Sequence, residues 1–146
     1  MRMSPDFKEF LELLNAREVE YLVVGGYAVA FYGYPRYTGD IDIWIATNHE
    51  NVQKVIDTLK IFGFASLDIT IEDLSSEDVV IQLGYPPNRI DIMTSATGLY
   101  FNECYQLSNI SMIDGVEVRF IDAESLKKYK KATNRHRDLD DLENLP

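Results

Sequence analysis

The sequence is poor in the residues that carry disulfides, zinc sites and contacts with nucleic acids. Its 146 residues include one cysteine and two histidines, which excludes an internal disulfide and provides no Cys/His cluster for zinc. There are 14 Lys and Arg against 24 Asp and Glu, a net charge of −10, whereas general nucleic-acid binders rely on cations that contact phosphate. No apolar run reaches the ~20 residues of a membrane span, and no signal-type segment follows the first residues. We therefore expect a cytoplasmic protein without membrane contact.

The sequence does contain enough apolar residues for one substantial core. Hydrophobic residues make up 46% of the chain, and 146 residues is near the usual size of one domain. Apolar alternation predicts strands at 21–24, 41–45, 79–83, 89–93 and 116–120. Helical spacing predicts a helix that starts at Ser4-Pro5, and further helices at 27–32, 49–61, 99–105, 124–132 and 135–145. We expect residues 1–146 to form a single α/β (α+β) domain, a mixed β-sheet flanked by helices.

The most informative residues are two aspartates at the start of the strand predicted at 41–45. Residues two apart in a strand point to the same face, so the carboxylates of Asp40 and Asp42 project together. Two ionised carboxylates side by side repel each other unless a cation neutralises them. Magnesium is the natural candidate, because it binds carboxylate oxygens and leaves sites open for water and substrate phosphates.

The preceding segment has the features of a phosphate-binding turn. The short apolar strand at 21–24 is followed by Gly25 and Gly26, which permit a tight turn, and then by the predicted helix. A junction of this kind presents backbone N–H groups and a helix N-terminus to an anion. Two glycines alone are a weak signal, but here the next strand carries the aspartate pair.

These residues resemble a known family. The runs Val24-Gly25-Gly26-Tyr27-Ala28-Val29 and Arg36-x-Thr38-x-Asp40-Ile41-Asp42 look like the nucleotidyltransferase superfamily of DNA polymerase beta type. Within it, they resemble the small bacterial and archaeal branch that includes AbiEii-type toxins of abortive-infection and toxin-antitoxin systems. The C-terminal run from Lys130 to Leu142 also looks like the ending of these proteins, although Asn134 stands where Gly is more usual and His136 where Pro is.

The resemblance implies a nucleotidyltransferase fold and a metal-dependent transfer of a nucleoside monophosphate from an NTP to an acceptor hydroxyl. The acceptor would be an RNA 3′ end such as that of tRNA, a protein side chain, or a small molecule such as an aminoglycoside; a cognate antitoxin is a further partner. The implied catalytic residues, which also bind two Mg²⁺ ions, are Asp40, Asp42 and, on the strand at 89–93, Asp91. The implied nucleotide-binding residues are Gly25, Gly26, Arg36, Thr38, Lys130 and Arg135.

Each candidate residue also has a simpler interpretation. Asp40 could cap a turn, Asp42 could pair with Arg36, and Asp91 could pair with Arg89 instead of a metal. The cations between residues 127 and 137 could form a solvated helix face. At the level of the whole protein, the alternative is a non-catalytic nucleotide-binding or regulatory member of the same fold that acts through a partner. Retention of all three carboxylates and both glycines argues against that alternative.

Overall fold

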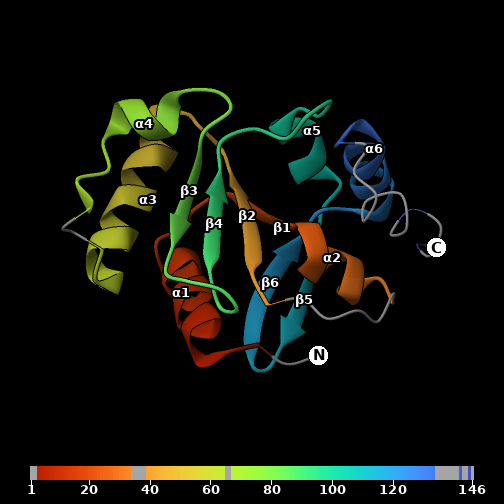
Figure 1. Cartoon of the computed structure of the whole chain (residues 1–146), viewed down its shortest axis with the longest axis horizontal. Coiled ribbons are helices and arrows are strands. Elements are labelled where there is room, and N and C mark those ends of the chain that lie inside the picture. The colour runs from red at the N-terminus through yellow and green to blue at the C-terminus, as the bar shows by residue number, and fades with distance from the viewer. Residues whose placement is uncertain (1–2, 34–38, 65–66, 134–141, 143–144, 146) are drawn as a thin grey trace.

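The computed structural model describes residues 3–33, 39–64, 67–133, 142 and 145. Its strands form one six-stranded sheet in the order β3-β4-β2-β1-β6-β5 (Figure 1). No helix within those ranges has the length and apolarity needed to cross a membrane. The elements in chain order are α1 (Pro5–Ala16), β1 (Tyr21–Val24), α2 (Gly25–Phe31), β2 (Ile41–Ile45), α3 (His49–Phe62), α4 (Ile71–Ser75), β3 (Val80–Leu83), β4 (Ile90–Met93), α5 (Phe101–Gln106), β5 (Asn109–Ile113), β6 (Val116–Phe120) and α6 (Ala123–Thr133).

The sheet combines parallel and antiparallel neighbours. β2 runs parallel to β4 and antiparallel to β1, and β1 runs parallel to β6. The outer strands β3 and β5 pair antiparallel with β4 and β6. The predicted α/β (α+β) class with a mixed sheet is therefore confirmed, and β3 and β4 each begin one residue later than the alternation predicts.

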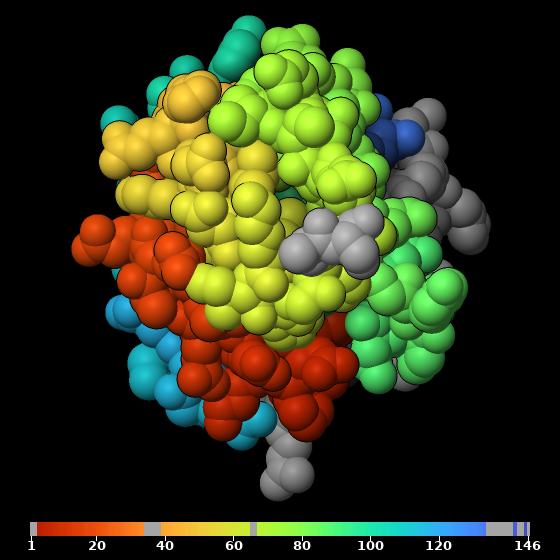
Figure 2. Space-filling view, turned by 90° about the vertical axis from the view of Figure 1, so that its left-hand side faces the viewer, coloured from red at the N-terminus to blue at the C-terminus, as the bar shows by residue number. Residues whose placement is uncertain are grey.

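Helices cover both faces of the sheet. In Figure 1, α3 and α4 lie to the left of the sheet, α1 lies below β3 and β4, and α2, α5 and α6 lie to the right, and Figure 2 shows α1, α3 and α4 from outside. Phe10 of α1 packs against Phe62 of α3 with ring centroids 5.1 Å apart, and Trp44 of β2 packs at the same distance against Phe101 of α5. Because Asp42 lies two residues before Trp44, its side chain leaves the sheet on the α5 side.

Helix boundaries follow local capping. The hydroxyl of Ser4 accepts the backbone N–H of Phe7 at the start of α1, with Pro5 as the first helical residue. The side chain of Asn48 caps α3 in the same way, and α3 ends at Gly63, which has φ +107°. The predicted start at Ser4-Pro5 and the predicted end near Gly63 are thus confirmed.

Two elements have no predicted counterpart, and both lack the period on which the prediction depended. β5 is an edge strand whose alternating Ile110 and Met112 are 50% and 65% exposed, so this alternation faces solvent, and Ile113 is the buried residue of the strand. α4 is a five-residue helix, too short for helical spacing, and is marked only by the capping box of Thr70 and Asp73. The predicted helix at 135–145 lies almost entirely outside the described residues.

Candidate active site

Three aspartates meet where β1 ends and β2 and β4 begin. Asp42 stands beside Asp91 in the parallel register of β2 and β4, and opposite Val24, the last residue of β1. Residues in register on neighbouring strands point to the same face, so the carboxyls of Asp42 and Asp91 lie side by side. Asp40 lies just before β2 and is tied to β4, because its Oδ1 accepts the backbone N–H of Arg89 at 3.0 Å. The structure thus brings the three predicted carboxylates together.

Burial and the neighbouring carboxyl groups raise the pKa of Asp42. Burial raises the pKa of Asp42 from 3.8 to about 6, and the charge of Asp91, the hydrogen bond between the two side chains and the charge of Asp40 act in the same direction. The charge of Lys130 opposes them. A hydrogen bond between two carboxyls requires one of them to be protonated. At pH values below about 6 the pair therefore holds a proton between its carboxyls, unless a cation takes its place.

Arg89 connects two of the three carboxylates. Its Nε donates to Asp91 Oδ1 at 2.7 Å and its Nη2 donates to Asp91 Oδ2 at 3.0 Å. The same Nη2 lies 3.4 Å from Asp40 Oδ2. The ion pair that was the simpler interpretation of Asp91 is therefore present. It does not remove Asp91 from the site, because Asp91 is only 7% exposed and still lies beside Asp42.

Gly25 allows the carboxyl of Asp42 to lie against the first turn of α2. Gly25 has φ +65°, a conformation that residues with a side chain rarely adopt. A Cβ atom at this position would overlap Asp42 Oδ2 and lie 3.0 Å from Asp42 Cγ. The positive φ that requires a glycine in this turn thus belongs to Gly25 and not to Gly26. The predicted helix at 27–32 in fact starts at Gly25, so both glycines belong to its first turn.

Lys130 supplies a buried positive charge beside the aspartates. It lies in the last turn of α6 and is 2% exposed. A buried ammonium is retained only where negative groups stabilise it, and the charge of Lys130 lowers the pKa of Asp42. Its neighbours fit the solvated helix face, since Lys127 forms an i,i+3 pair with Glu124 and Lys131 is exposed. The structure therefore separates Lys130 from the other cations of α6.

Replacing Lys130 with Ala is expected to destabilise the protein by about 1–3 kcal/mol, because it leaves the aspartate cluster without a buried counter-charge. It should also weaken NTP binding if the cluster holds a nucleotide. Lys131→Ala, on an exposed position of the same helix, is the matched control and should change the free energy of unfolding by less than about 0.5 kcal/mol. Urea denaturation of both variants measures the difference, and equal stabilities would show that the charge of Lys130 is not needed in the folded core.

In their present arrangement, the carboxylates are engaged with Arg89 and with each other. Among residues 3–33, 39–64, 67–133, 142 and 145, no group of three or more His, Cys, Asp or Glu side chains is arranged to hold a metal ion. The guanidinium of Arg89 takes both oxygens of Asp91. Metal binding would therefore require Arg89 to move.

The sequence profile of one family matches residues 3–146, and that family is described as "Nucleotidyl transferase of unknown function (DUF2204)". The chain belongs to this nucleotidyl transferase family. It is therefore a transferase enzyme by family. No curated protein matches the chain.

Solved structures with the same fold are nucleotidyltransferases or resemble them. A candidate nucleotidyltransferase from Thermotoga maritima has a TM-score of 0.62 at 14% identity, covering 98% of this chain and 94% of its own. The lincosamide antibiotic adenylyltransferase LnuA, solved with lincomycin, has a TM-score of 0.58 at 16% identity, covering 98% and 96%. ANT(2″)-Ia, solved with adenylyl-2″-tobramycin, has a TM-score of 0.58 at 14% identity, covering 94% and 83%. At these identities the likeness establishes the nucleotidyltransferase fold.

Three predicted nucleotide-binding residues, Arg36, Thr38 and Arg135, lie outside the described residues. Arg89, by contrast, was not predicted to take part in function. Its signal was its position two residues before Asp91, which places both side chains at the same end of β4. The ion pair of Arg89 with Asp91 is compatible with a place for Asp91 beside Asp42.

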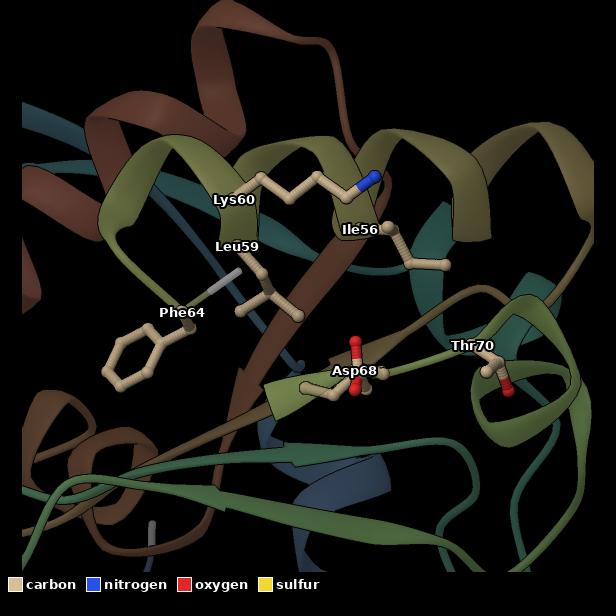
Figure 3. A pocket seen from close by; sticks show the side chains of 7 residues that line it. Ile56, Leu59, Lys60, Phe64, Asp68 and Thr70 are labelled. Atoms are coloured by element: carbon tan, nitrogen blue, oxygen red, sulfur yellow. The ribbon is translucent and has the colours of Figure 1, made fainter. Parts of the chain in front are cut away.

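A hollow of about 290 Å³ lies elsewhere on the molecule (Figure 3). It opens between α3 and the segment that leads to α4, on the group of helices shown in Figure 2. It shares no residue with the aspartate cluster, so it is not part of the candidate active site. Its lining residues are Ile56, Leu59, Lys60, Phe64, Asp68, Ile69 and Thr70.

Proposed function

We propose that residues 1–146 act as a single nucleotidyltransferase-like domain that transfers a nucleoside monophosphate from an NTP to an acceptor hydroxyl, with Mg²⁺ as the metal. The observation that carries this proposal is the register of Asp42 beside Asp91, with Asp40 tied to the same strand pair. Three carboxylates gathered on one edge of a sheet are costly as anions. A bound cation would offset the repulsion between them, so such a cluster is suited to binding a metal ion.

The donor set fits a hard divalent ion. Asp40, Asp42 and Asp91 offer only carboxylate oxygens, which suit Mg²⁺ better than softer metals. Asp42 and Asp91 are close enough to share a hydrogen bond and to raise the pKa of Asp42, and a divalent ion would replace that shared proton. We propose that the three side chains hold two Mg²⁺ ions, which supply charge stabilisation at the phosphate and lower the pKa of the attacking hydroxyl.

The reaction we propose is an in-line displacement at the α-phosphorus. The acceptor oxygen forms a bond to this phosphorus while the bond to the oxygen bridging the α- and β-phosphates breaks, and pyrophosphate leaves with that bonding pair. The hydroxyl proton passes to a carboxylate, for which Asp91 is the proposed base. Enzymes of this type gain most of their rate from positioning and charge stabilisation.

The glycines and cations around the aspartates are proposed to bind the triphosphate. Gly25 and Gly26 form the first turn of α2, and its backbone N–H groups are the proposed donors to a phosphate. Lys130 supplies a buried positive charge at the same place. Arg36, Thr38 and Arg135 complete the proposed nucleotide site on the sequence resemblance alone.

The acceptor is proposed from three classes. LnuA and ANT(2″)-Ia carry an antibiotic or its adenylyl derivative, which favours a small-molecule hydroxyl. The resemblance of the Gly-Gly to Asp-x-Asp block to AbiEii-type toxins favours an RNA 3′ end such as tRNA, or a protein side chain, in a toxin-antitoxin setting with a cognate antitoxin. A cytoplasmic location agrees with all three classes and also stays a prediction.

Incubation with α-labelled NTPs, Mg²⁺, total cellular RNA and protein, and an aminoglycoside and lincosamide panel tests the function. Label should appear in one acceptor class, disappear with EDTA, and fall by at least ~100-fold in Asp40→Asn, because a metal ligand matters more than the outer partners whose loss costs roughly 10–100-fold. Asp114→Asn is the matched control, because Asp114 is an exposed aspartate in the β5–β6 turn whose φ of +53° Asn also tolerates. NTP binding without labelling of any fraction would instead favour the non-catalytic member of the fold.

A further inference from the structure

The guanidinium of Arg89 is bound to two of the three carboxylates proposed to hold metal. It forms a two-bond fork with Asp91, at 2.7 and 3.0 Å, and its Nη2 lies 3.4 Å from Asp40. Its backbone N–H also bonds Asp40, which fixes the start of the side chain at the edge of β4. Arg89 thus belongs to the aspartate cluster by three separate contacts.

A guanidinium and a divalent metal ion compete for the same oxygens. Both oxygens of Asp91 and Oδ2 of Asp40 contact the guanidinium of Arg89, and a metal bound to these carboxylates would need the same oxygens. Arginine stays protonated at any pH of interest, and its hydrogen bonds with Asp91 raise its pKa further. The competition is therefore not relieved by loss of a proton. It is relieved only if the side chain moves.

The side chain of Arg89 has room to move. It is 24% exposed, whereas the side chain of its partner Asp91 is 9% exposed, so Arg89 is the more solvent-accessible member of the pair. An arginine has several rotatable bonds between this fixed backbone and its guanidinium. Once released from Asp91, the guanidinium remains tethered within reach of any anion that binds at the cluster.

We propose that Arg89 is a nucleotide-binding residue that is held by Asp91 and Asp40 until metal binds, and then contacts a phosphate of the NTP. The planar fork that matches the carboxylate of Asp91 also matches two oxygens of one phosphate group. The exchange keeps the charges of the site balanced, because the metal neutralises the aspartates while Arg89 neutralises part of the triphosphate. This inference rests on the proposed function and adds a residue and an order of events to it.

A purely structural ion pair makes different demands. If Arg89 only stabilised β4, its removal would lower the stability of the protein without improving metal binding. If Arg89 competes with metal, its removal should improve metal binding and at the same time impair nucleotide binding. The two opposite changes in one variant distinguish a competing, nucleotide-binding arginine from a structural one.

The experiment measures Mn²⁺ binding to the whole chain by electron paramagnetic resonance, and then ATP and GTP binding at saturating Mn²⁺ by calorimetry. In Arg89→Gln, Mn²⁺ alone should bind roughly 3–10-fold more tightly. The nucleotide should bind about 10-fold more weakly, a loss of about 1.4 kcal/mol of binding free energy. Arg89→Lys should recover part of the nucleotide affinity, since it keeps the charge but not the fork. Arg119→Gln is the control, because Arg119 stacks on Tyr105 and its guanidinium donates to the hydroxyl of Ser108.

The outcomes separate this inference from the proposed function. Unchanged Mn²⁺ affinity, or unchanged nucleotide affinity, in a folded Arg89→Gln protein would overturn the role of Arg89. If wild-type Mn²⁺ binding persists in Asp42→Asn, or is absent altogether, the metal site itself is wrong and the inference fails with it. Thermal unfolding checks that Arg89→Gln is folded, and Arg89→Lys repeats both measurements with the positive charge retained.

Discussion

Asp42→Asn is expected to abolish nucleotidyl transfer and, at pH 7.5 without metal, to make the protein more stable. The loss of activity follows from removal of the carboxylate that stands beside Asp91 and against Gly25. The gain in stability follows because burial and the neighbouring aspartates disfavour the ionised form of Asp42. An amide has the same shape, carries no charge and can donate to Asp91. We expect a gain of about 1–2 kcal/mol, reduced from the full effect because Lys130 loses a partner.

The pH dependence of this gain has a definite sign. The pKa of Asp42 is raised from 3.8 to about 6 in the folded protein, so between these values the folded state binds more protons at Asp42 than the unfolded state does. The contribution of Asp42 to stability is therefore fully present below about pH 4 and is lost as pH rises through 6. The stability difference between Asp42→Asn and wild type should grow over that window and level off above pH 7.

Urea denaturation of both proteins between pH 4 and pH 8, in the presence of EDTA, measures this difference. Taking the difference removes the contributions of the other acidic groups, which both proteins share. Asp114→Asn should parallel the wild type at every pH, because Asp114 is exposed. A variant that is less stable than wild type at pH 7.5 would mean that Lys130 and Arg89 compensate the buried charge completely, and that the aspartates are not strained against one another.

More of the candidate site could be predicted from the sequence than its hydrophobic periodicity alone specifies. Strand alternation placed Asp42 and Asp91 on strands and Asp40 just before one, and the pairing of β2 with β4 then set Asp42 beside Asp91. That pairing joins strands separated by two helices and a hairpin partner, so no local pattern specifies it. The resemblance to a family supplied Asp91, and the structure supplies the reason why Asp91 belongs with the other two.

What the sequence could not provide was the burial and direction of single side chains. Lys130 lies in a run of lysines with the composition of a solvated helix face, and only the packing of α6 places it among the aspartates. The two adjacent glycines look equivalent in sequence, but of the two only Gly25 has a positive φ, and a Cβ at Gly25 would overlap Asp42. Such assignments depend on tertiary contacts that composition and periodicity do not encode.

Gly25→Ala is therefore expected to be the most damaging single-methyl change in the site. It places a side chain at φ +65°, which costs about 1–2 kcal/mol, and it sets a methyl group onto Asp42 Oδ2. Because the carboxyl must move, we expect transfer to fall by roughly 100-fold, as for other displacements of ~1 Å in a catalytic group. Gly115→Ala is the matched control, since Gly115 has φ +84° with no atom within 4 Å of an added Cβ. Gly115→Ala should lose stability through the backbone strain alone and should keep full transfer activity.

A double-mutant cycle isolates the contact between Gly25 and Asp42. Asp42→Ala removes the carboxyl that an added methyl would meet and leaves its own Cβ 3.2 Å from that position. In this background, the stability cost of Gly25→Ala should drop toward that of Gly115→Ala, because the backbone strain and a single tight contact with the Asp42 Cβ remain. The coupling energy read from urea denaturation should be about 1–3 kcal/mol. An equal cost of Gly25→Ala in both backgrounds would mean that the glycine serves the turn alone, and that the position of Asp42 does not depend on it.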